Sequence, residues 1–110
     1  MTYVLNLLWD LDQPGAACTV DDLERGVAEA GLARFTGLDG LHVKVWYRDG
    51  TRYGSTMVFA DADAREETAT WVTDRLPALC GLRPVRVESS EGLAIAEGGA
   101  GAALPIDRPA

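Results

Sequence analysis

The stretch LHVKVWYRDGTRYGSTMVF, residues 41 to 59, decides the fold class. Its first half alternates between two sets of side chains, Leu41, Val43, Val45 and Tyr47 in one and His42, Lys44 and Trp46 in the other. This period of two predicts a β-strand with one set on each face. Asp49-Gly50 favours a tight hairpin, because both central positions of a type I′ turn need positive φ. A second strand over Tyr53 to Phe59 is expected to return beside the first.

A strand and a helix are predicted before this hairpin. Residues 3 to 9 are β-rich and almost continuously apolar, which is typical of a central strand covered on both faces. Thr19-Val20-Asp21-Asp22 resembles a capping box, and it predicts a helix that runs to about Ala33. The inward stripe of that helix is expected to be Val20, Leu23, Val27 and Ala30.

A second helix and a last strand are predicted after the hairpin. Asp61-Ala62-Asp63 caps the helix, and Pro77 and Gly81 end it. Its apolar repeat is Ala64, Thr68, Trp71, Val72 and Leu76. Pro84 to Glu88 is expected to form the last core strand, with Val85 and Val87 opposite Arg86 and Glu88. Leu93 to Ala96 adds either a short fifth strand or an arm that reaches a partner.

The predicted order βαββαβ is that of a ferredoxin-like α+β domain, an antiparallel sheet with two helices on one face. We expect this domain to span residues 1–96, followed by a flexible tail rich in Gly, Ala and Pro over residues 97–110. The other sheet face would then carry Trp46 among His42 and Lys44. A second copy of the chain is the simplest cover for such a face, because a two-fold interface needs only one self-complementary patch. We therefore predict a homodimer.

Composition limits the classes of protein and partner. The 110 residues suffice for one domain, and the net charge of -7 argues against nucleic acid and membrane surfaces as partners. The N-terminus lacks the basic segment of a secretion signal, so a cytoplasmic protein is expected. Cys18 and Cys80 lie far apart in the sequence and outside metal-ligand spacing. We expect neither a disulfide framework nor a metal site, and an inert buried thiol at Cys80.

The chain resembles the dimeric α+β barrel superfamily, and within it the YdhR-like and antibiotic biosynthesis monooxygenases. The likeness rests on Gly40-Leu41-His42-Val43-Lys44-Val45-Trp46, on Gly54 through Phe59-Ala60-Asp61, and on the helix that follows to Gly81. The resemblance implies a homodimer with one pocket per subunit and an oxygenase that needs no cofactor, neither metal nor flavin. Such enzymes oxidise aromatic or polyketide-type molecules by letting a deprotonated substrate pass an electron to dioxygen.

Haem-degrading members of this superfamily use an Asn on the first strand together with a Trp and a His on the second helix. Asn6 and Trp71 stand in comparable places in this chain. The chain's one His, His42, lies on a predicted strand, so the sequence argues against haem degradation.

The candidate site residues each have two readings. His42 and Asn6 are the candidate catalytic residues, although a lone His is often a surface group and Asn6 would also serve as a hydrogen bond across the dimer. Trp46, Trp71, Tyr53 and Trp9 are the candidate substrate-binding residues, although large aromatics are often plain core. Lys44 is expected to snorkel or to pair with Glu88 or Asp10.

The leading hypothesis is a cofactor-independent monooxygenase-like enzyme acting on a small aromatic or polyketide-type substrate. Two alternatives stay open. One is a redox-neutral cyclase or isomerase of a polyketide-like intermediate, and the other is a non-catalytic dimer that binds a small ligand.

Overall fold

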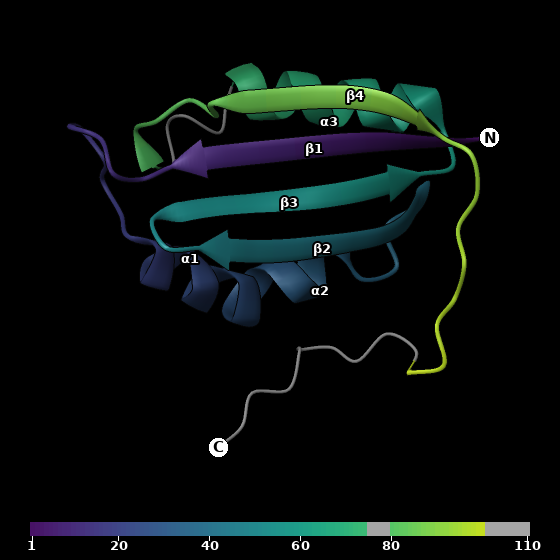
Figure 1. Ribbon diagram of the computed structural model, residues 1–110, viewed down its shortest axis with the longest axis horizontal. Coiled ribbons are helices and arrows are strands. Elements are labelled where there is room, and N and C mark those ends of the chain that lie inside the picture. The colour runs from purple at the N-terminus through teal and green to yellow at the C-terminus, as the bar shows by residue number, and fades with distance from the viewer. Residues whose placement is uncertain (75–79, 101–110) are drawn as a thin grey trace.

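Strand β1 (Thr2–Asp10) runs through the middle of the sheet in this computed structural model, which describes residues 1–74 and 80–100. The other strands are β2 (Leu41–Asp49), β3 (Arg52–Phe59) and β4 (Arg86–Gly92). All neighbouring strands are antiparallel, in the order β2-β3-β1-β4 (Figure 1). The helical segments are α1 (Val20–Gly26), η1 (Val27–Gly31), α2 (Leu32–Phe35) and α3 (Ala62–Asp74). The element order βαββαβ confirms the predicted α+β topology.

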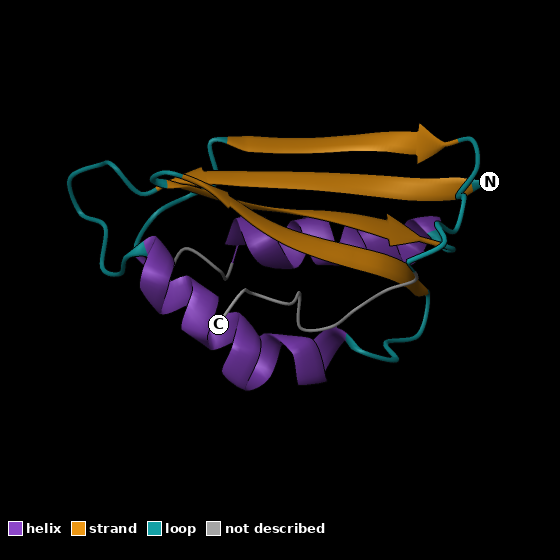
Figure 2. Cartoon of the chain, turned by 60° about the horizontal axis from the view of Figure 1, so that its bottom comes forward, coloured by secondary structure: helices purple, strands orange, loops and turns teal. Residues whose placement is uncertain are grey.

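The core lies between the sheet and the helices, which all lie on one side of it (Figure 2). Strand β1 alternates, so that Leu5, Leu7 and Trp9 face the helices and are buried. Met57 and Phe59 of β3 join them, as do Val72 of α3 and Leu82. Burying these apolar groups is the main favourable contribution to folding. Among residues 1–74 and 80–100, no helix is long and apolar enough to cross a bilayer.

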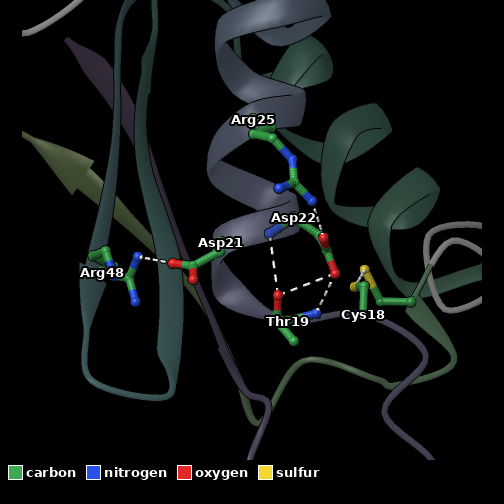
Figure 3. A network of polar contacts seen from close by, with 7 residues as sticks. Cys18, Thr19, Asp21, Asp22, Arg25 and Arg48 are labelled. Carbon is green, nitrogen blue, oxygen red and sulfur yellow. Dashed lines mark hydrogen bonds and ion pairs between the residues drawn. The ribbon is translucent and has the colours of Figure 1, made fainter.

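The capping box predicted at the start of the first helix is confirmed. The Asp22 backbone N–H donates to Oγ1 of Thr19 at 3.2 Å, and the Thr19 N–H donates to Oδ2 of Asp22 at 2.9 Å (Figure 3). These bonds satisfy donors that the first helical turn leaves free. The hydrogen bond from the Thr19 backbone lowers the pKa of Asp22. Arg48 of β2 donates to Asp21 at 2.7 Å, which ties the hairpin to this helix.

A π-helical turn interrupts the first helix and changes its inward face. The Leu32 N–H donates to the Val27 carbonyl, five residues back, so η1 is wider than an α-helical turn. Val20 is buried and Val27 half-buried as predicted, but Ala30 is exposed. The predicted stripe is wrong at Ala30 because, in the wider π-helical turn, each residue is rotated about the helix axis by a smaller angle than in an α-helix. Gly31 and Phe35 face the sheet instead, and the helical stretch continues to Phe35.

A β-bulge in β2 reverses the predicted faces of the hairpin. Leu41 is opposite Phe59, yet Val43 is already opposite Val58, so His42 is the extra residue. One added residue exchanges the two faces of every later position, because side chains alternate with a period of two. Lys44 and Trp46 therefore lie on the helix side. The open face of β2 carries Val43, Val45 and Tyr47, which are 38%, 45% and 41% exposed.

The last strand begins two residues later than predicted and runs to Gly92. Val85 precedes it and donates its N–H to the Leu8 carbonyl at 2.7 Å. Residues 93–98 form no strand, and Leu93 is 96% exposed, so the predicted fifth strand is absent from the described part of the chain. The predicted helix positions Leu76 and Pro77 lie outside the described residues, as does most of the predicted tail.

Gly54 of β3 lies on the open face at a position that has no room for a side chain. An added Cβ would overlap the Tyr47 ring and lie 2.8 Å from the Leu7 carbonyl oxygen, which is fixed in the sheet. We expect Gly54→Ala to lower the free energy of unfolding by about 1–3 kcal/mol, as overpacking does elsewhere. Gly26→Ala is the control, because nothing lies within 4 Å of its added Cβ. Urea unfolding measures both variants. A larger loss in the free energy of unfolding for Gly26→Ala than for Gly54→Ala would contradict the close packing of Gly54 against Tyr47 and Leu7.

Candidate functional site

A cavity of about 330 Å³ opens between α2 and α3 on the helix side of the sheet. Its lining residues are Arg34, Phe35, Leu38, Glu67, Thr68 and Trp71. The volume is at the lower end of the range for small-molecule sites. Two aromatic faces and a few polar groups meet there, which suits a flat ligand that carries one or two polar substituents.

Lys44 lies beside this cavity without lining it. Its Nζ is 3.5 Å from the centre of the Phe35 ring and 4.7 Å from that of Trp46. Burial, followed by the charge of Arg34, lowers the pKa of Lys44 to about 7. The two ring faces favour the ammonium form and offset part of this effect. Near neutral pH the amine is therefore divided between its neutral and charged forms, so it can accept a proton as well as donate one.

Arg34 is a second cation in the same cluster. Its guanidinium carbon is 4.8 Å from the centre of the Trp71 ring and 5.8 Å from that of Phe35. Neither Arg34 nor Lys44 forms an ion pair with a carboxylate of the described residues. Glu88 pairs with Arg86, and Asp10 accepts from Thr51, so the predicted partners of Lys44 are engaged elsewhere. An anionic ligand would supply the missing counter-charge.

The π-helical turn positions the aromatic part of the cluster. Gly31 faces the Trp46 ring, and an added Cβ there would lie 3.6 Å from it, which is an ordinary van der Waals contact. The Phe35 ring meets Trp46 edge-on, with 5.8 Å between ring centres and an interplanar angle of 74°. We call Lys44, Arg34, Phe35, Trp46 and Trp71 the cation–aromatic cluster. It brings together two of the predicted substrate-binding residues, Trp46 and Trp71.

The two predicted catalytic residues lie away from this cluster. Asn6 alternates with the buried Leu5 and Leu7, so its side chain is on the open face, where Oδ1 accepts from Thr56 Oγ1 at 2.7 Å. Its amide has thereby found one partner on the sheet itself. His42 is the exposed bulge residue at the edge strand. Asn6 and Trp71 are on opposite sides of the sheet, so the structure does not bring that pair together.

Trp9 and Tyr53 are on the helix side but at the hairpin end of the sheet. Trp9 is 5% exposed and belongs to the core, with its ring centre 6.0 Å from that of Tyr53. Burial, followed by the nearby thiols of Cys80 and Cys18, raises the pKa of Tyr53 to about 12. The phenol therefore stays protonated at neutral pH. Neither residue lines the cavity.

The sequence contains one signal that would have directed attention to Lys44. It is the only lysine among the 10 basic residues of the chain, the others being arginines. Lysine is the cation whose pKa falls readily on burial, whereas arginine stays charged. Arg34 and Phe35 carried no comparable signal, because their direction depends on the π-helical turn.

Comparison with known proteins identifies no family. A scan against protein-family models finds no match, and a search of curated proteins finds no significant similarity. The proposed function therefore starts from the cation–aromatic cluster and the cavity beside it.

Lys44 gives a direct test of the site. The free energy of unfolding of the wild type should rise between pH about 7 and about 10, because the unfolded chain keeps the Lys44 proton after the folded protein has lost it. Lys44→Met should lack this rise and should be more stable than the wild type by about 1–2 kcal/mol at pH about 6, where the wild type must bury a charged group. Chemical unfolding across this pH range measures both effects.

The pKa of Lys44 can also be measured in the wild-type sequence, without a substitution. Reductive methylation with ¹³C-formaldehyde labels the single lysine and the N-terminal amine, and the shift of the lysine signal can be titrated by NMR. A titration at the ordinary lysine value of about 10.4 would contradict the buried cluster.

Proposed function

We propose that the protein binds a flat, weakly acidic aromatic or polyketide-type molecule in the cavity between α2 and α3 and acts on it as a cofactor-independent, monooxygenase-like enzyme. The observation that supports this proposal is the cation–aromatic cluster, in which Lys44 and Arg34 face aromatic rings and lack a carboxylate partner among the described residues. The resemblance to the YdhR-like monooxygenases supports the choice of reaction.

Four members of the cluster have a role in this proposal. Phe35 and Trp71 line the cavity and pack against the flat ring system. Lys44 does not line the cavity, so its neutral amine accepts the proton of the substrate as a general base once the ligand reaches past the Phe35 ring, whose centre is 3.5 Å from Nζ. The guanidinium of Arg34 stabilises the anion that results. Ionising the substrate is the step that the chain's own side chains perform.

Oxidation then follows from the chemistry of the anion. The carbanion passes one electron to dioxygen, and the resulting superoxide and carbon radical combine to a peroxide anion. This anion takes back the proton that Lys44 holds and becomes a hydroperoxide. Loss of water from the hydroperoxide leaves a ketone. For an anthrone, the CH₂ group and O₂ thus become C=O and H₂O, because the remaining C–H proton and the departing hydroxide leave together as water. Dioxygen is the oxidant in this reaction, and no metal or flavin takes part in it.

Oxygen uptake with 1,8-dihydroxyanthrone tests the proposal. We expect turnover by the wild type, a loss of about 10²-fold in kcat for Lys44→Met, and a smaller loss in kcat/KM for Arg34→Met. Arg83→Met, which removes an exposed cation outside the cluster, is the matched control and should keep the wild-type rate. A rate that falls in Asn6→Ala or His42→Ala but not in Lys44→Met would place the reaction elsewhere.

The same general base would also serve a redox-neutral cyclase or isomerase, because proton abstraction needs no oxygen. Product that forms equally well under anaerobic conditions would favour that function. A third outcome is binding without turnover, seen as quenching of tryptophan fluorescence by anthraquinone-2-carboxylate with no oxygen uptake. That result would favour a ligand-binding protein.

We also propose that two copies of the chain pair through the open face of the sheet. The residues that support this are Val43, Val45 and Tyr47, each about two-fifths exposed, together with the half-buried Val4 and Val58. They form an apolar surface on one side of the sheet, and a two-fold interface would need only that one patch.

The dimer is tested by a charge at the centre of the patch. We expect Val45→Asp to weaken association by about 10²-fold or more, because the carboxylate would be buried without a partner. Leu93→Asp is the control, since Leu93 is 96% exposed and outside the patch. Sedimentation equilibrium across a concentration series measures the effect. A wild type that stays monomeric at every concentration would refute the interface.

A further inference from the structure

The two cysteines of the chain meet in space, although 62 positions separate them in the sequence. The Cys18 thiol donates to the Cys80 sulfur, with 2.7 Å between the sulfur atoms. A disulfide bond places its sulfur atoms about 2.05 Å apart, so the pair needs to approach by less than about 1 Å to form one. Their distance along the chain did not indicate this contact, which depends on how the two segments pack.

Backbone contacts hold the two cysteine segments together independently of the sulfur atoms. The Ala17 N–H donates to the Cys80 carbonyl at 3.0 Å. Gly81, at φ +76°, lies against the Gly15 carbonyl oxygen, which an added Cβ would approach to 3.0 Å. The loop before α1 and the segment that contains Cys80 are thus in contact on either side of the thiol pair. Such a scaffold favours bond formation within one chain over bond formation between chains.

We propose that Cys18 and Cys80 are a dithiol site that forms a reversible intramolecular disulfide by exchange with a low-molecular-weight disulfide. The site is separate from the cavity between α2 and α3, and the proposal does not depend on the proposed function. The disulfide would join the residues just before α1 to the segment that follows α3, so it would link the two helical regions on the helix side of the sheet.

The exchange has a defined order. Cys18 is half-buried, so a small disulfide can reach it, whereas Cys80 is 7% exposed. Burial, the hydrogen bond from Cys18, and the charges of Cys18 and Asp22 raise the pKa of Cys80 to about 12, which leaves little thiolate on that side. Figure 3 shows Cys18 beside Thr19 and Asp22. Cys18 is therefore the first nucleophile and Cys80 the second.

The disulfide forms in two successive thiol–disulfide exchanges. The Cys18 thiolate attacks one sulfur of the small disulfide, and a mixed disulfide forms as the first small thiolate departs. The Cys80 thiolate then attacks the Cys18 sulfur and releases the second small thiolate. The protein loses two electrons and two protons, and one small disulfide becomes two small thiols. Excess small thiol reverses both steps.

Oxidation of the full chain by glutathione disulfide tests the proposal. The reduced wild type should lose both thiols and end as a monomer whose mass is lower by two hydrogen atoms, with the glutathione adduct only transient. Proteolysis without reduction should yield one peptide pair that joins Cys18 to Cys80. Closure in the folded chain should be at least about tenfold faster than in urea, because folding supplies the proximity. Retention of both thiols, a stable adduct, or bonds between chains would each overturn it.

Thermal unfolding supplies a second readout that needs no substitution. The oxidised wild type should melt roughly 10 °C above the reduced protein, because the bond closes a long loop, and dithiothreitol should abolish the difference. The matched controls are Cys18→Ser and Cys80→Ser, which should show no dependence of Tm on the redox buffer. Equal melting temperatures for the oxidised and reduced wild type would contradict the proposal.

Discussion

The one extra residue at His42 determines how the two sides of the sheet are used. A strand has only two faces, so the bulge between Leu41 and Val43 moves every later side chain of β2 to the opposite face. Leu41 can then pack in the core while Lys44 and Trp46 also face the helices. Without the bulge, Leu41 or the Lys44–Trp46 pair would have to lie on the open face, and the cation–aromatic cluster would not exist.

Two unfavourable contributions to stability meet in that cluster, the lost hydration of Lys44 and its repulsion by a second cation. Lys44 gives up much of its hydration beside a second cation, Arg34, and the rings of Phe35 and Trp46 return only part of the lost free energy. Arg48 has a carboxylate partner in Asp21, whereas Glu67 lines the same cavity as Arg34 without forming an ion pair with it. In the proposed function, the charge of a bound ligand completes the site. The π-helical turn beside it is a further local irregularity of the kind that is common at functional sites.

Secondary structure was largely predictable because it depends on neighbours in the sequence. The capping box at Thr19 and the strand that begins at Leu41 depend on a few neighbouring residues, and each occurs where it was predicted. The hairpin turn forms one residue later than predicted, at Gly50 and Thr51 between the paired Asp49 and Arg52, and only Gly50 has the positive φ that a type I′ turn needs at both positions. The end of β4 was misplaced because its residues Glu88 to Gly92 are polar and carry no period-two pattern. They are held by pairing with β1, which is a tertiary contact.

The sequence by itself determined the βαββαβ order, the central apolar strand and the hairpin, since local propensity and periodicity are sufficient for each. Tertiary structure alone decided which face Trp46 occupies, which partners Lys44 lacks, and that Cys18 meets Cys80. A bulge and a π-helical turn each shift the register by one residue, and such a shift is chosen by packing across the whole core. The distance between two thiols likewise depends on how distant segments dock, and no pattern along the chain encodes that distance.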